Sequence, residues 1–183
     1  MVSAATTNGG KSGVSWVRTA LWGAAAALLV APAVAMRFTT EVNWTASDFV
    51  FAAVVFGTVG LLAEAAVRMS RNWAYRAGAA FALAAAFLIV WANAAVGMIG
   101  SEDNAYNLYF FGVVALALAG AAASRFRAGG MALTMLVAGV AQGGLALGGY
   151  SADPRGAVFS ATFAGLWLLS AALFRTASGS ATK

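Results

Sequence analysis

The chain has 183 residues, of which 62% are hydrophobic and 9% are charged, and its formal net charge is +5. Soluble proteins carry roughly 25% charged residues, so this composition excludes an ordinary soluble domain and predicts a surface that mostly faces lipid. The chain contains no His and no Cys, which excludes disulfides, thiolate chemistry, His or Cys metal sites and a Ser-His-Asp triad. Because its only lysines, Lys11 and Lys183, lie near the ends, a buried Schiff-base lysine is excluded as well.

Charged residues divide the chain into six apolar stretches, each close to the ~20 residues that a helix needs to cross a hydrocarbon layer of ~30 Å. No segment has the short alternating pattern of a membrane β-strand. The sequence therefore predicts an all-α integral membrane bundle over residues 14–175, with six transmembrane helices arranged as three hairpins, between a mobile N-terminal tail 1–13 and a C-terminal tail 176–183. We expect the spans at about 16–36, 48–68, 76–99, 105–124, 129–150 and 155–174.

The first apolar stretch also resembles a secretory signal peptide. Lys11 and Arg18 precede it, and Ala33-Val34-Ala35 has the small-residue pattern of a cleavage site. We interpret this stretch as a retained first helix. Cleavage after Ala35, which would leave five helices, is the alternative.

The distribution of basic residues predicts how the bundle is oriented. With six spans, both termini and the loops after the even spans lie on one side, which carries nine basic residues, while the other side has only Arg37 and Arg155. Because positive loops stay cytoplasmic, we expect both termini inside. The membrane topology and the attraction to anionic lipid then explain why Lys and Arg outnumber Asp and Glu. No nucleic-acid partner is therefore expected. The nine residues are Lys11, Arg18, Arg68, Arg71, Arg76, Arg125, Arg127, Arg175 and Lys183.

The opposite side carries an acidic rim that comes from three loops. Its members stand where helices are expected to begin: Thr45 to Asp48 has a capping-box pattern, Ser101 to Asn104 offers several caps, and Asp153 precedes Pro154. Carboxylate and amide oxygens also suit Ca²⁺ or Mg²⁺, but no loop has EF-hand spacing, so we expect a solvated acidic face and no metal site. The rim consists of Glu41, Asp48, Glu102, Asp103, Asn104 and Asp153.

Three polar residues within the spans are candidates for transport or for buried hydrogen bonds. Glu64 is the only acid within a span, and Arg68 follows it at the i, i+4 spacing that favours a helical ion pair. We expect a structural pair with Arg68, or with Arg18, Arg71 or Arg76, and keep a proton or cation relay as the alternative. For Asn93 and Gln142 we expect hydrogen bonds between helices.

The chain is rich in small residues, which let membrane helices approach closely. Two adjacent small-xxx-small units occur in the fifth span, formed by Gly139 with Gly143 and by Gly144 with Gly148. We expect these glycines to pack inside one bundle, and oligomerisation is the alternative. Dense alanine packing also implies little internal space, so no roomy ligand cavity is expected.

Residues 100–104, together with four further segments, resemble a family of small, uncharacterised bacterial polytopic inner-membrane proteins. The resemblance covers nearly all of the chain after the N-terminal tail, and its most distinctive part is Gly100-Ser101-Glu102-Asp103-Asn104, where the family continues with a proline and this chain has Ala105. It implies a multi-pass protein of the bacterial inner membrane and implies no activity, substrate or cofactor. The other segments are residues 36–49, 74–78, 90–97 and 163–170.

The sequence favours a non-enzymatic structural or accessory protein without a cofactor, which acts through contacts with itself, with membrane lipid or with a larger membrane complex. The first alternative is a small transporter or channel that uses Glu64, Asn93 and Gln142. The second is a membrane enzyme that acts on lipid headgroups at Asp48, Glu102 and Asp103.

Overall fold

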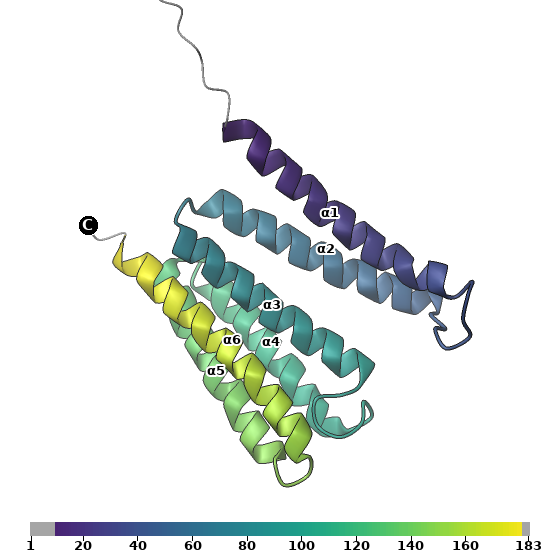
Figure 1. Ribbon diagram of the computed structural model, residues 1–183. Helices are drawn as coiled ribbons and strands as arrows, with labels where there is room; N and C mark the ends of the chain where they lie inside the picture. The colour runs from purple at the N-terminus through teal and green to yellow at the C-terminus, as the bar shows by residue number, and fades with distance from the viewer. Residues whose placement is uncertain (1–9, 181–183) are drawn as a thin grey trace, which may run out of the picture. The chain divides into compact units, whose positions relative to one another are not determined.

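The computed structural model describes residues 10–180, with side chains from residue 18 onward. Over this part the chain is helical, and six of its helices are long and apolar enough to span a membrane. The predicted all-α fold class is confirmed to that extent (Figure 1). The helices are α1 (Gly10–Ala35), α2 (Ala46–Met69), α3 (Trp73–Ala95), α4 (Leu108–Ala123), α5 (Ala128–Gly149) and α6 (Pro154–Gly179), with a short 3₁₀ turn, η1 (Ala105–Asn107), before α4.

The chain divides into two compact units, with the boundary inside α2 at Leu61 and Leu62. In the first unit, α1 and the first part of α2 approach closely. A Cβ added at Gly60 would stand only 2.9 Å from the Trp22 ring. Residues 1–9 and 181–183, which include Lys183, and the side chain of Lys11 lie outside the described part of the chain.

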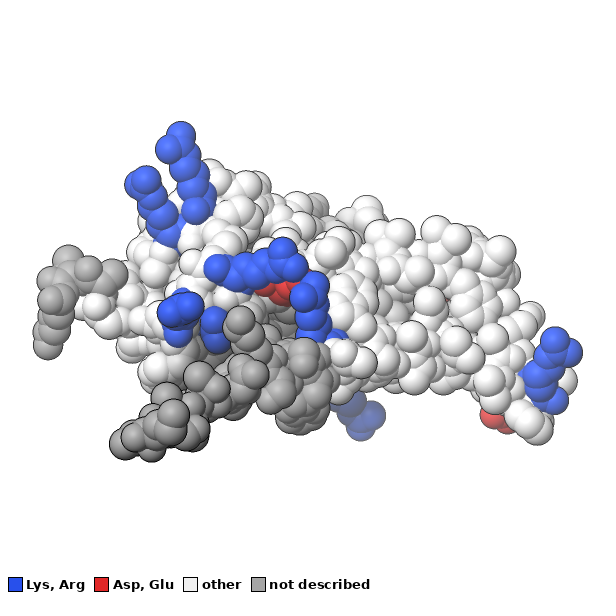
Figure 2. All heavy atoms as spheres, turned by 90° about the horizontal axis from the view of Figure 1, so that it is seen from above, with Lys and Arg blue, Asp and Glu red and all other residues white. Residues whose placement is uncertain are grey.

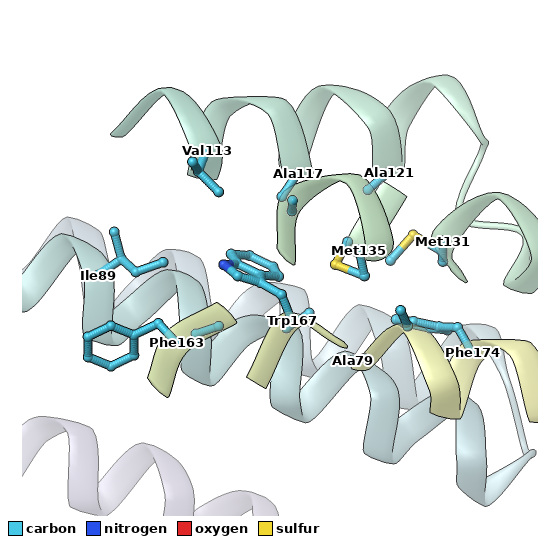
Figure 3. Packing of buried hydrophobic residues seen from close by; sticks show 14 of the residues in the cluster. Ala79, Ile89, Val113, Ala117, Ala121, Met131, Met135, Phe163, Trp167 and Phe174 are labelled. Atoms are coloured by element: carbon cyan, nitrogen blue, oxygen red, sulfur yellow. The ribbon is translucent and has the colours of Figure 1, made fainter. Parts of the chain in front are cut away.

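The second unit contains the end of α2 and a bundle of four helices, α3 to α6. Helix α6 packs against α3 and α5, and α4 packs against the same two helices, so a core lies between the four. Alanines make up much of this core, which lets the helices approach closely, and the large side chains of Phe110, Trp167 and Phe174 are fully buried in it. Figure 3 shows Trp167 and Phe174 in this core.

Some observed helix bounds differ from the expected spans. Helix α3 ends at Ala95, well before the expected end at 99, because Gly97 adopts a left-handed conformation (φ 77°) and turns the chain. Residues 105–107 form the 3₁₀ turn and precede α4. Helix α1 begins within the expected N-terminal tail, at Gly10, and α6 continues into the expected C-terminal tail as far as Gly179.

Candidate functional site

An apolar pocket of about 140 Å³ lies in the second unit, between the last turns of α2 and the bundle. Its walls come from five helices and from the turn that joins α4 to α5. This pocket is a correction to the sequence analysis, which expected no roomy cavity. The lining includes Leu62, Ala66, Ala82, Ala121, Phe126 and Trp167.

Short side chains from two neighbouring helices leave the space of the pocket unfilled. Ala79 and Ala82 of α3 and Ala117 and Ala121 of α4 present only methyl groups to this space. In Figure 3 Ala117 and Ala121 point toward Trp167 and the methionines of α5, which form the opposite wall. Alanine permits close packing where helices touch, but it fills little volume where they separate.

One end of the pocket is formed by a strained turn between α4 and α5. Arg125 and Phe126 both have a positive φ, 51° and 58°, in the left-handed region that side chains rarely adopt. The hydroxyl of Tyr75, a buried residue of α3, donates to the Phe126 carbonyl oxygen at 2.8 Å, and the Phe126 amide donates to Ala121 O at 3.0 Å. These bonds hold the Phe126 side chain at the pocket, and such outliers concentrate at functional sites.

Arginines gather at the end of the second unit where this turn lies. The Tyr75–Phe126 bond and an Asn72–Ser180 bond of 2.9 Å bring the start of α3 beside the ends of α4 and α6. Arg76 donates to the carbonyl oxygens of Ser70 and Val67, at 2.7 and 2.9 Å, which attaches the end of α2 as well. Figure 2 shows arginine side chains gathered in one region of the surface with few carboxylates beside them. The arginines of this end are Arg68, Arg71, Arg76, Arg125, Arg127 and Arg175.

Glu64 forms the predicted ion pair with Arg68, one turn later on α2. The Arg68 side chain is largely exposed, and the Glu64 side chain is largely covered. The lining of the pocket does not include Glu64. The pair joins two residues of one helix at the i, i+4 spacing that predicted it.

Gln142 and Asn93 are both buried, but only Gln142 bonds in the way the sequence analysis expected. Its side-chain amide nitrogen donates to the Ser160 hydroxyl of α6 at 2.9 Å, which is a bond between helices. The Asn93 amide nitrogen donates to Ile89 O of its own helix at 3.0 Å, so the expectation of an interhelical bond is wrong for this donor. A carbonyl one turn back lies within closer reach than a neighbouring helix does.

Three buried polar atoms have no hydrogen-bond partner among the described residues: Asn93 Oδ1, Gln142 Oε1 and Trp167 Nε1. In Figure 3 the indole nitrogen of Trp167 lies on the side of Ile89 and Phe163, away from Met131 and Met135. The ring therefore presents carbon atoms to the methionine side of the core. Buried polar atoms of this kind are commonly satisfied by ordered water.

The acidic rim is mostly accounted for by the starts of helices and by turns. The Asp48 carboxylate accepts from the Thr45 amide at 2.7 Å, which is one half of the predicted capping box. Asn104 accepts from the Tyr106 amide at 3.0 Å and so caps η1, whereas the expected cap lay directly before α4. Glu41, Glu102 and Asp103 are exposed, in a bend and in turns. Among the described residues no group of carboxylates is placed to hold a metal ion.

The loop from α3 to η1 contains a residue that the sequence analysis missed. Asn107 is buried, and its Oδ1 accepts from the amides of Met98 and Ile99 at 3.1 and 2.9 Å, while its Nδ2 donates to Ser101 O at 2.8 Å. This single side chain therefore satisfies the backbone of a buried loop. The only signal in the sequence is an Asn at the start of an apolar stretch, which does not distinguish a cap from a buried bridge.

Asp153 connects the last two loops of the rim. It is the predicted N-cap of α6 and accepts from the amides of Gly156 and Gly100, each at 2.9 Å. The Gly156 amide, and after it the Gly100 amide, lower the pKa of this carboxyl below its ordinary value of 3.8. The charged form is the one that these amides stabilise.

We expect Asp153→Ala to lower the unfolding temperature at neutral pH. At low pH we expect the substitution to lower it by less. Because the pKa is depressed in the folded state, the stabilisation is fully present above pH 3.8 and is lost as the pH falls through the lower folded value. Thermal unfolding in detergent at neutral pH and at low pH measures the difference from the unmodified chain. Asp103→Ala is the control, and an equal difference at both pH values would contradict the role of the charge.

The four glycines of α5 have different surroundings. A Cβ at Gly139 would stand 2.9 Å from the Leu168 side chain and 3.3 Å from Trp167 Cβ, whereas a Cβ at Gly143 would stand 3.9 Å from Ala164. A Cβ at Gly144 would meet nothing within 4 Å, and at Gly148 the nearest atom is the Tyr106 hydroxyl at 2.7 Å. The first small-xxx-small unit thus faces α6 within the bundle, as expected, and Gly144 does not.

Comparison of the chain with protein families, with curated proteins and with solved structures finds no match.

Proposed function

We propose that this chain is a multi-pass protein of the bacterial inner membrane with an accessory role, which it fulfils through contacts with lipid and with other membrane proteins. In this proposal the helices form three hairpins and both termini are cytoplasmic. The arginine-rich end of the second unit supports the orientation, since Arg155, in the first turn of α6, is the only basic residue among residues 96–107 and 150–155 at the other end.

The observation that carries the proposal is the apolar character of both the outside and the pocket of the bundle. Large side chains on the outer face of α5 are well exposed, as Leu133, Val140 and Leu147 are at 63%, 66% and 77%. Apolar exposure of this extent suits an acyl environment or a partner helix. Asp48, Asp153 and Glu64 are engaged in helix starts and in an ion pair, which supports a role in contacts over one in catalysis for these three carboxylates.

Labelling of single cysteines tests the proposed topology without interference, because the chain has no cysteine of its own. Glu102→Cys is expected to react with a membrane-impermeant maleimide added to intact spheroplasts, and Arg71→Cys is expected to react only after lysis. The reverse pattern would refute the orientation, and reaction of both positions in intact cells would refute the number of crossings between them.

The transporter alternative retains one specific observation in its favour. The acceptor atoms Asn93 Oδ1 and Gln142 Oε1 are buried without partners among the described residues, and water in a polar path would satisfy them. On this alternative, Gln142→Leu would abolish a solute flux in proteoliposomes, whereas the accessory role predicts no flux with either chain.

A further inference from the structure

We propose that the apolar pocket of the second unit holds one acyl chain of an anionic phospholipid, whose headgroup phosphate lies against Arg125 and Arg127. This inference rests on the proposed function, because it requires the bundle to lie in a bilayer with its arginine-rich end at the interface. It adds a specific lipid site to a general role in contacts.

The pocket has the chemistry and the length for part of a hydrocarbon chain. Its lining consists of hydrophobic residues, and cavities of comparable size in proteins accept apolar guests and exclude water. Along α4 the lining extends from Val114 to Ala121, which corresponds to roughly 10 Å at the helical rise of 1.5 Å per residue. A helix of a partner protein, ~10 Å in diameter, is too wide for a space of about 140 Å³.

A ligand with polar ring atoms, such as a quinone, fits the pocket less well. The Tyr75 hydroxyl already donates to Phe126 O at 2.8 Å. The Trp167 nitrogen lies on the side of its ring away from Met131 and Met135, which also line the pocket (Figure 3). The pocket therefore offers no unengaged donor to a carbonyl group on this side, which favours a plain alkyl chain.

The turn at the end of the pocket supplies the charge that selects an anionic headgroup. Phe126 lines the pocket, and Arg125 and Arg127 flank it in the sequence. Among the described residues neither Arg125 nor Arg127 forms an ion pair with a carboxylate. The Glu64 carboxylate pairs with Arg68. Arginine binds phosphate oxygens through several parallel donors, and basic residues near the membrane surface attract anionic lipid.

Quenching of Trp167 by brominated lipid tests the site directly. The variant of the full chain in which Trp16, Trp22, Trp44, Trp73 and Trp91 are each changed to Phe keeps Trp167 alone, which is 1% exposed. In detergent micelles, phosphatidylglycerol with brominated acyl chains is expected to quench this fluorescence saturably, and brominated phosphatidylcholine only at higher concentration. Native mass spectrometry of the unmodified chain is expected to show one retained phosphatidylglycerol.

Matched variants separate the pocket from the general lipid surface. Ala121→Leu fills the pocket, and its neighbour Ala122→Leu adds the same atoms on the exposed face of α4. We expect Ala121→Leu to weaken binding about tenfold, equivalent to about 1.4 kcal/mol, and Ala122→Leu to leave it unchanged. If Ala121→Leu does not fold, Ala117→Leu with Ala119→Leu forms a second pair on the same helix.

The double variant Arg125→Gln with Arg127→Gln tests the headgroup contact. It is expected to lose the preference for phosphatidylglycerol over phosphatidylcholine, and the control Arg155→Gln is expected to keep that preference.

Equal quenching in Ala121→Leu and Ala122→Leu, or no saturable quenching, overturns the lipid site. Extraction of the chain from membranes by alkaline carbonate overturns the proposed function as well. An integral chain without saturable quenching refutes only the lipid site.

Discussion

Replacing Asn107 with alanine is expected to lower the free energy of unfolding by roughly 2–6 kcal/mol, since each buried group left without a partner costs about 1–3 kcal/mol. The substitution removes the acceptor for the Met98 and Ile99 amides. Both residues are buried, at 1% exposure, so water cannot replace the lost bonds without entering the core. The Ser101 carbonyl loses its donor in addition.

Denaturant unfolding of detergent-solubilised protein measures this cost. Asn107→Asp keeps an acceptor for the two amides, but it replaces the donor to Ser101 O with an oxygen and brings a carboxylate to a buried site, so it too is expected to be less stable than the unmodified chain. Asp103→Ala, in the exposed part of the same loop, is expected to change stability by less than about 0.5 kcal/mol. An Asn107→Ala protein as stable as that control would show that the loop does not depend on the bridge.

Gly139→Leu is expected to destabilise the bundle by about 3 kcal/mol, near the upper end of what overpacking usually costs. Even a Cβ at Gly139 would stand 2.9 Å from the Leu168 side chain and 3.3 Å from the Trp167 Cβ, so a leucine there is expected to displace Leu168 and to press on α6 at Trp167. Because Trp167 fills the centre of the core, we expect the displacement to reach α3 and α4. The same unfolding assay measures the loss.

Gly144→Leu is the matched control on the same helix. Its Cβ would meet nothing within 4 Å, so the fold of a monomer is expected to tolerate the change. Sedimentation in detergent then tests the oligomerisation alternative: if Gly144→Leu dissociates a dimer while leaving the bundle folded, the second glycine unit is an interface between copies. If Gly139→Leu is as stable as Gly144→Leu, the close α5–α6 contact is refuted.

The sequence by itself determined the features that depend on composition or on residues a few positions apart. Six apolar stretches predicted the six helices, because chain length and hydropathy alone decide whether a helix can cross hydrocarbon. The Glu64–Arg68 pair and the cap of Asp153 on Gly156 join residues within one helical turn, so spacing was enough to predict them. The ends of α3 and α6 were less predictable, since an apolar residue suits both a helix and a buried loop.

Only the tertiary structure decided which surfaces face one another. Asn107 bridges a loop whose amides lie eight and nine positions away, and no local pattern specifies that closure. Gly139 and Gly144 look equivalent in the sequence, yet one packs against α6 and the other meets open space. The pocket arises where alanines of α3 and α4 line a shared space that their short side chains do not fill. Each of these outcomes depends on the rotation and separation of helices, and these are set by the fit of all the side chains in the core together.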